Sequence, residues 1–229
     1  MSPTASTTTR RRGRPPKATH DAAAAIRRAA LQLFARHGFA GCSVADIARA
    51  ANVAKPLVHY HYGSKEALWQ ASVSEAFASL QTHLGQLAAQ LAQSTPEQAF
   101  QQAALALVQH AATHPDLVRI VVQETGQAGE RGTWLLHSHL VPMYQAAGLA
   151  YERWREQGHV RPDAPPVAHL IPSVLGLMHF AFLEADVVRL ALAQDVFSTA
   201  YIAQQGALLH RWFQAMCLPQ PDHGSTANN

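Results

Sequence analysis

Side chains that could bind a polyanion gather between residues 43 and 65 of this sequence. A lysine there can donate to a phosphate oxygen or a guanine edge, and histidine and tyrosine offer further hydrogen-bonding groups. Proline and leucine beside them could touch a thymine methyl group, and a serine ahead of a helix could help to hold a phosphate. The candidate nucleic-acid contacts are Ser43, Lys55, Pro56, Leu57, His59, Tyr60, His61 and Lys65.

Three short helices are predicted to position these side chains. Asp21 can cap the first helix, and Gly38 ends it with the left-handed backbone that glycine accepts. Ser43 is a good cap for the second helix. Asn52 marks the tight turn before the third helix, which ends at Gly63. A short turn between the last two of three helices indicates a helix-turn-helix.

The remaining chain is also predicted to be helical, which gives an all-α fold of about nine or ten helices. A long fourth helix is expected from Lys65 to about Gln93, and glycines and prolines separate later segments with apolar residues at three-and-four spacing. The predicted organisation is a disordered basic arm at 1–19, a helix-turn-helix domain at 20–67, a larger helical domain at 68–218 and a disordered polar tail at 219–229.

Charge is distributed unevenly along the chain. Through Tyr62 the sequence has ten basic residues and two acidic ones, a balance of about +8, which leaves about −5 for the rest. A basic first quarter on an acidic remainder predicts that the first part meets a polyanion and the second part has another task.

The N-terminal arm contains Arg11-Arg12-Gly13-Arg14-Pro15-Pro16-Lys17, which resembles an AT-hook. Its glycine would let the backbone lie deep in a narrow minor groove while the flanking cations meet the negative potential there. Arg12, Arg14 and Lys17 are therefore candidate DNA contacts, and a nonspecific solvated arm is the alternative. Deleting residues 1–19 is expected to weaken DNA binding and to flatten its salt dependence.

The run Ser43-Val44-Ala45-Asp46-Ile47-Ala48, followed by Asn52 to Leu68, resembles the DNA-binding domain of the TetR/AcrR family of one-component regulators. The resemblance extends from about Asp21 to Leu68 and implies that the third helix enters the major groove. It departs from the family pattern at Ala54, where a Ser or Thr hydroxyl usually stands ahead of the lysine.

This resemblance also implies a homodimer on a palindromic operator and a C-terminal domain that encloses a small ligand. The two helices that pair with a partner would be about 166–189 and 194–217, and the dimer candidates are Val174, Phe197, Tyr201, Leu208 and Trp212. The ligand candidates are Phe77, Leu84, Phe100, Leu107, Val121, Trp134, His139, Met143, Tyr144, His179 and Phe182. The apolar residues at helical spacing on each of these two helices are equally compatible with the internal core of one protomer.

Other classes of function find less support in the residues. The sequence lacks a nucleophile elbow, a Walker loop, a dinucleotide fingerprint and a zincin helix, so neither catalysis nor a cofactor is predicted. His59 and His61 stand two apart and cannot share a helix face, and the pair His110 and His114 lacks a clear third metal ligand. A ligand-independent architectural DNA-binding protein and an activator of the same fold stay open as alternatives.

A cytoplasmic protein without a membrane partner is expected. The N-terminus is polar and then basic, with no apolar run of the kind a signal peptide has. The apolar stretch from Leu170 to Leu183 is short for a bilayer span and contains Pro172.

Overall fold

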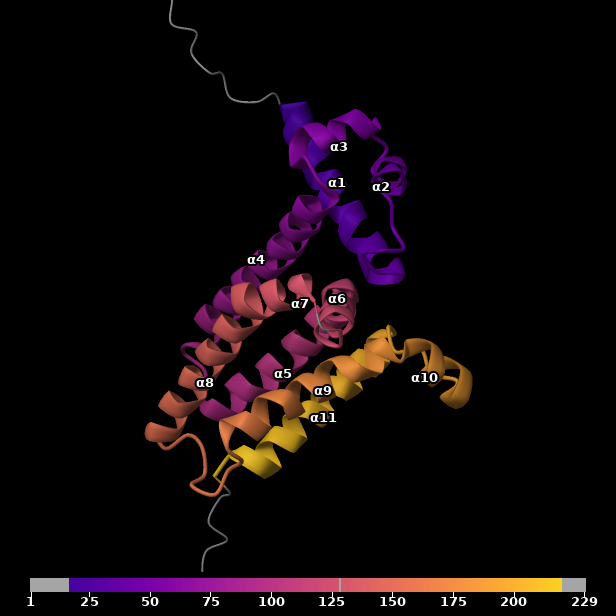
Figure 1. Cartoon of the computed structure of the whole chain (residues 1–229). Coiled ribbons are helices and arrows are strands. Elements are labelled where there is room, and N and C mark those ends of the chain that lie inside the picture. Colours follow the sequence, from indigo (N-terminus) through magenta and orange to yellow (C-terminus); the bar gives the residue numbers. More distant parts are fainter. Residues whose placement is uncertain (1–16, 128, 220–229) are drawn as a thin grey trace, which may run out of the picture.

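The computed structural model describes residues 17–127 and 129–219. Across these two ranges the chain forms helices and no strand, so the predicted all-α fold is confirmed (Figure 1). The elements are α1 (Lys17–His37), α2 (Val44–Ala50), α3 (Lys55–Tyr62), α4 (Lys65–Leu91), α5 (Pro96–Thr113), α6 (Pro115–Thr125), α7 (Glu130–Leu135), the π-helical turn η1 (Leu136–Leu140), α8 (Val141–Glu156), α9 (Val167–Leu183), α10 (Ala185–Leu192) and α11 (Thr199–Cys217).

Helices α1 to α3 form a small bundle at one end of the molecule (Figure 1). Ser43 caps α2 in a capping box, because its hydroxyl accepts from the Asp46 N–H and the Asp46 carboxylate accepts from the Ser43 N–H. Asn52, with φ of 54°, and Gly63, with φ of 70°, make the left-handed turns that bracket α3. Local signals in the sequence thus place the turns of this bundle.

Helix α1 begins at Lys17, earlier than the predicted cap at Asp21. The intervening residues Ala18, Thr19 and His20 contain no helix breaker, so Asp21 lies inside the helix rather than at its start. The last three residues of the predicted arm, 17–19, therefore belong to α1. Arg12 and Arg14 lie outside the described residues.

The long helix α4 joins the N-terminal bundle to the rest of the chain (Figure 1). Its 27 residues correspond to about 40 Å of helix at 1.5 Å per residue. The first half of α4 is buried in one core with α1, α6 and α7, to which Trp69 and Phe77 contribute. Helix α4 is thus packed against both α6 and α7.

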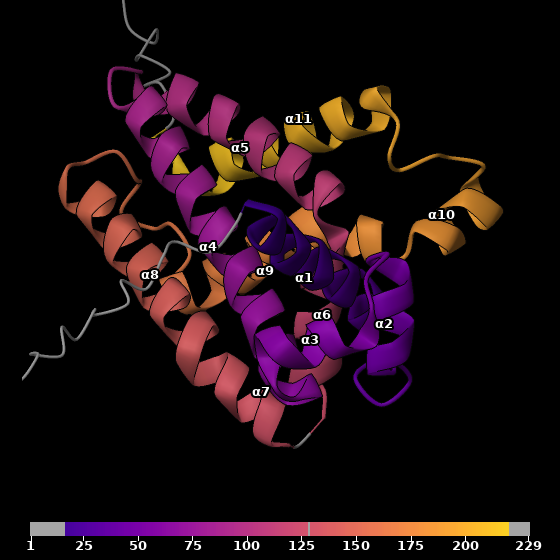
Figure 2. The same cartoon turned by 90° about the horizontal axis from the view of Figure 1, so that it is seen from above.

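The C-terminal helices pack around α5, α9 and α11, as Figure 2 shows from above. Gly206 lets α11 approach α5 closely, because a Cβ at that position would stand 3.0 Å from Leu105 Cα. Helix α8 lies against α9 on the other side. Two further cores form here, one around Val108, Met178 and Phe182, and one around Tyr151 and Cys217.

The predicted single helix over 166–189 is broken at Glu184 into α9 and α10, which are bent by 66°. The bend lets the chain after α10 return, so that Val196 joins the core that holds Met178 and Phe182. Burial of Val196 is a tertiary contact that helical spacing does not encode. Within the described ranges no single helix is long and apolar enough to cross a membrane. Only α9 and α10 taken together have the length and composition of a membrane span, and they are bent.

Candidate functional site

The first turn of α3 and one side of that helix face solvent. Lys55, Pro56 and Tyr60 are exposed, Tyr60 to 78%. Ala54 at the N-cap makes no side-chain hydrogen bond to the helix. Pro56 has no N–H, and the Leu57 N–H donates to the Ala54 carbonyl at 2.9 Å, so the group of this turn suited to an anion is the exposed Lys55 ammonium.

The opposite side of α3 is fixed to α1 and α4 through Tyr62 and Val58. Val58 is buried, and the Tyr62 hydroxyl donates to the Ala23 carbonyl at 2.9 Å. That hydroxyl also accepts from the Arg27 guanidinium at 2.9 Å, which in turn donates to the Glu75 carboxylate of α4 at 2.8 Å. The hydrogen bond to Glu75 raises the pKa of Arg27, and burial raises the pKa of Tyr62. The orientation of α3 is thus tied to α4.

Four other sequence-predicted contacts are Ser43, His59, His61 and Lys65, and all but His61 have a hydrogen-bonding or cation–π partner within the protomer. The Ser43 hydroxyl is occupied in the α2 cap, and Asp46, which receives its hydrogen bond, has a lowered pKa for that reason. The exposed His59 Nδ1 lies 3.3 Å from the Gly63 carbonyl. His61 is half-buried, and its Nε2 is buried without a hydrogen-bonding atom among the described residues. The Lys65 ammonium lies 4.3 Å from the centre of the Phe39 ring.

Of the remaining predictions, Leu57 is half-buried on α3, and Lys17 is the first residue of α1, with no side-chain position described.

A contact that the sequence analysis missed joins the N-terminal bundle to α7. The Arg131 guanidinium lies 4.0 Å from the Phe39 ring centre and donates from Nε to the Glu124 carboxylate at 3.1 Å. Glu66 at the start of α4 lies 3.9 Å from the same guanidinium, and burial raises its pKa. The Gln123 amide adds a hydrogen bond to the Ala35 carbonyl at 2.9 Å. These residues are too far apart in sequence for spacing to reveal them.

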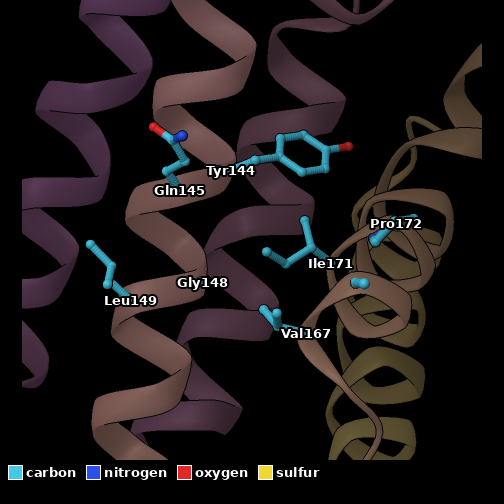
Figure 3. Close-up of a pocket in the computed structure, with 8 residues that line it drawn as sticks. Tyr144, Gln145, Gly148, Leu149, Val167, Ile171 and Pro172 are labelled. Atoms are coloured by element: carbon cyan, nitrogen blue, oxygen red, sulfur yellow. The ribbon is translucent and has the colours of Figure 1, made fainter.

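A groove of about 580 Å³ runs between α8 and α9. Figure 3 shows Tyr144 reaching from α8 toward Ile171 of α9, with Val167 below them. The wall carries no charged side chain, and its polar side-chain groups are the Tyr144 hydroxyl and the Gln145 amide. The lining residues are Tyr144, Gln145, Gly148, Leu149, Val167, Ala168, Ile171 and Pro172.

Of the eleven ligand candidates, only Tyr144 lines this groove. Five others pack in or against the core that α4 shares with α6 and α7, where the His139 ring stacks on Phe77 with centres 4.5 Å apart. Those five are Phe77, Val121, Trp134, His139 and Met143. Leu107 and Phe182 belong to the core around Met178, and Phe100 stacks on Phe213. Leu84 and His179 are half-buried. The structure does not gather the eleven side chains into one pocket.

Three histidines form a stack between α4 and α5. The rings of His83 and His110 have centres 4.7 Å apart, and those of His110 and His114 are 4.3 Å apart. Burial, together with His114, His83 and His179 nearby, lowers the pKa of His110 to about 4. Within the described ranges no three potential ligands are placed to hold a metal ion.

The five dimer candidates divide between surface and core. Phe197 and Leu208 are exposed, whereas Val174, Tyr201 and Trp212 pack against the protomer's own cores. The outward face of α9 instead presents Pro172, Gly176 and Phe180, which is 64% exposed. The neighbouring exposed face of α11 carries Ala200, Ala203, Ala207 and Leu208. The four-residue spacing of Pro172, Gly176 and Phe180 is visible in the sequence, but it does not say which face turns outward.

Two family descriptions match the chain. Residues 26–71 match "Bacterial regulatory proteins, tetR family", and residues 96–211 match "Tetracyclin repressor-like, C-terminal domain". The HTH-type transcriptional repressor NicS of Pseudomonas putida is 29% identical over 104 residues, 45% of this chain and 48% of NicS. MftR of Mycobacterium tuberculosis is 43% identical over 58 residues, 25% of this chain and 26% of MftR. The chain thus spans about half or less of these curated relatives.

Solved structures share the fold at low sequence identity. SCO4942 of Streptomyces coelicolor has a TM-score of 0.64 at 22% identity, over 86% of this chain and 98% of that one. A Saccharomonospora viridis protein, solved in complex with choline, has a TM-score of 0.61 at 15% identity, over 88% of this chain and 100% of that one. The C-terminal match alone covers half of the sequence, and the N-terminal match falls on the helix-turn-helix; the chain belongs to the TetR family of bacterial regulatory proteins.

Proposed function

We propose that the protein is a transcriptional repressor that binds a palindromic operator as a homodimer and is released by a small ligand. The observation that carries DNA binding is the exposed side of α3, where Lys55, Pro56 and Tyr60 face solvent. A helix of this kind fits the major groove with its N-terminal residues at base edges. The basic arm at 1–16 would add phosphate or minor-groove contacts.

A homodimer is supported by the apolar face that α9 and α11 leave uncovered in the protomer. Phe180, Leu208 and the small residues between them would be buried by a second copy. Apolar patches of this kind on a soluble protein mark interaction sites. A two-fold dimer would present two copies of α3 to the two halves of a palindrome.

Release by a ligand is supported by the α8–α9 groove and by the contacts that lead from α7 to the N-terminal bundle. Helix α8, which forms one wall of the groove, follows directly on η1 and α7, and Arg131 of α7 contacts the Phe39 ring. A ligand that binds better when α8 is displaced would shift the population away from the form that fits DNA. The uncharged wall favours an apolar ligand with one or two hydrogen-bonding groups.

Footprinting of the DNA that flanks the coding sequence tests the DNA-binding part directly. The purified protein is used at near-physiological salt with excess competitor DNA, and Lys55→Gln serves as the matched variant. We expect protection of two half-sites about one helical turn, or a multiple of it, apart, and loss of protection in the variant. If competitor DNA abolishes protection equally for the parent protein and for the Lys55→Gln variant, an architectural role would be favoured instead.

A further inference from the structure

Helix α10 is the element least covered by its own protomer. None of its residues is buried, and it projects from the body on the side away from α8 in both views (Figures 1 and 2). Leu190 is 75% exposed, and Val187 lies beside it on the same outward face. An isolated helix of eight residues has little stability of its own in water, so an apolar outward face indicates a surface that another chain covers.

The α8–α9 groove is a second uncovered apolar surface. Leu149 at its edge is 66% exposed, and Ala168 and Pro172 on its α9 side are also open to solvent. The groove lies beside the N-terminal half of α9, whereas α10 follows the C-terminal end of the same helix. Because α8 and α10 stand on opposite sides of the molecule, α10 cannot cover the groove of its own protomer (Figure 2).

A two-fold dimer would bring these two surfaces together. Gly176 stands midway on the outward face of α9, and a Cβ there would meet no atom within 4 Å, so a partner helix could approach closely at this point. If two α9 helices cross antiparallel at Gly176, a residue that follows Gly176 by a given number of positions lies opposite the partner residue that precedes Gly176 by the same number. Leu183, the last residue of α9, then lies opposite His169, so the partner's α10, which is bent by 66° from its own α9, starts beside the groove.

We propose that α10 of one protomer lies over the α8–α9 groove of its partner, so that each ligand site is completed by the second chain. The inference rests on the homodimer proposed above. Val187 and Leu190 would form the missing apolar wall opposite Val167, Ala168 and Leu149. The arrangement is isologous, because the same pair of contacts occurs twice about the axis. A ligand held in this way contacts both chains and therefore acts on their relative orientation, which sets the spacing of the two α3 helices.

Cysteine cross-linking of the full-length protein tests the proposal. Two double variants join α10 to either edge of the groove: Leu149→Cys with Leu190→Cys, and Ala168→Cys with Leu190→Cys. All three positions are exposed, so the substitutions leave no cavity. The natural Cys42 and Cys217 are buried, and burial raises the pKa of both thiols, that of Cys217 to about 11, so they react slowly. The three single variants and the parent protein are the matched controls.

After treatment with a short bismaleimide, we expect a covalent dimer from at least one double variant and little from any control. Sedimentation of the untreated protein gives its oligomeric state independently. The protein could be a dimer in solution while neither double variant gives more covalent dimer than its single variants. That result would overturn the docking of α10 but would leave the homodimer intact. A monomer in solution with no cross-link would contradict the homodimer, and the inference with it.

Discussion

The Arg131 guanidinium of α7 lies 4.0 Å from the centre of the Phe39 ring, which follows α1 in the N-terminal bundle. Lys65 at the start of α4 contacts the same ring at 4.3 Å. One aromatic side chain thus joins the helix-turn-helix bundle, the long connecting helix and the part of the chain that leads to α8. Gly132 lets α7 lie close to the end of α6, because a Cβ there would stand 2.5 Å from the Glu124 carbonyl oxygen.

Arg131→Gln is expected to lower the free energy of unfolding by about 1–3 kcal/mol, because it removes a cation–π contact and leaves the largely buried Glu124 without its cation. Urea unfolding at pH 7 measures this. Arg155→Gln removes an exposed ion pair on α8 and is the control, for which we expect a change below about 0.5 kcal/mol. Equal effects of the two substitutions would contradict the role of Arg131 at this junction.

Tyr62 and Tyr60 provide a matched pair on α3. Tyr62→Phe removes two hydrogen bonds that fix α3, and it should cost about 1–2 kcal/mol of stability. Tyr60→Phe removes an exposed hydroxyl and should leave stability within about 0.5 kcal/mol while weakening DNA binding by about 0.5–1.5 kcal/mol. Thermal unfolding and fluorescence anisotropy separate the two effects. A stability loss confined to the Tyr60 variant would reverse the assignment of the two faces.

Lys55→Gln should reduce the salt dependence of DNA binding. Each phosphate contact contributes about 0.9 to the slope of log K against log salt, so loss of two Lys55 side chains in a dimer should lower the slope by about 2. Titrations at several salt concentrations give this slope. Arg155→Gln removes a charge far from α3 and should leave it unchanged; an unaltered slope for Lys55→Gln would show that Lys55 does not meet phosphate.

Stability should fall as the pH is lowered from about 6.5 to 4. His110 has a lowered pKa of about 4 in the folded protein, against 6.5 in the unfolded chain, so the unfolded state binds more protons in this window. The loss attributable to His110 should be about 1–2 kcal/mol once solvent screening of a half-buried group is allowed for. His110→Gln should flatten the difference between urea unfolding at pH 7 and at pH 5. Parallel profiles for both proteins would assign the pH dependence to other groups.

The helix-turn-helix could be predicted from sequence because its signals are local. The cap at Ser43, the turn at Asn52 and the stop at Gly63 each act within a few residues. The break at Glu184 could not be predicted in this way, because no glycine or proline marks it, and the burial of Val196 that accompanies it is a contact with residues distant in sequence. The ligand candidates are spread over several cores and the groove, because apolar side chains at helical spacing look alike whether they fill a core or line a groove.

The contact between Phe39 and Arg131 joins residues 92 positions apart, and no periodicity connects them. The outward face of α9 had a visible pattern in Pro172, Gly176 and Phe180, yet only the folded chain distinguishes it from the inward stripe of Leu170, Val174 and Met178.

The measurement that tests the central claim most directly is the ratio of affinities for the footprinted sequence and for a scrambled duplex of the same composition, at near-physiological salt. A sequence-specific regulator should prefer its site by at least about 10³-fold. The preference should be lost when either half of the palindrome is scrambled, because both copies of α3 must be engaged. A ratio near one, with strong binding to both duplexes, would contradict the account and identify the exposed face of α3 as a nonspecific cationic surface.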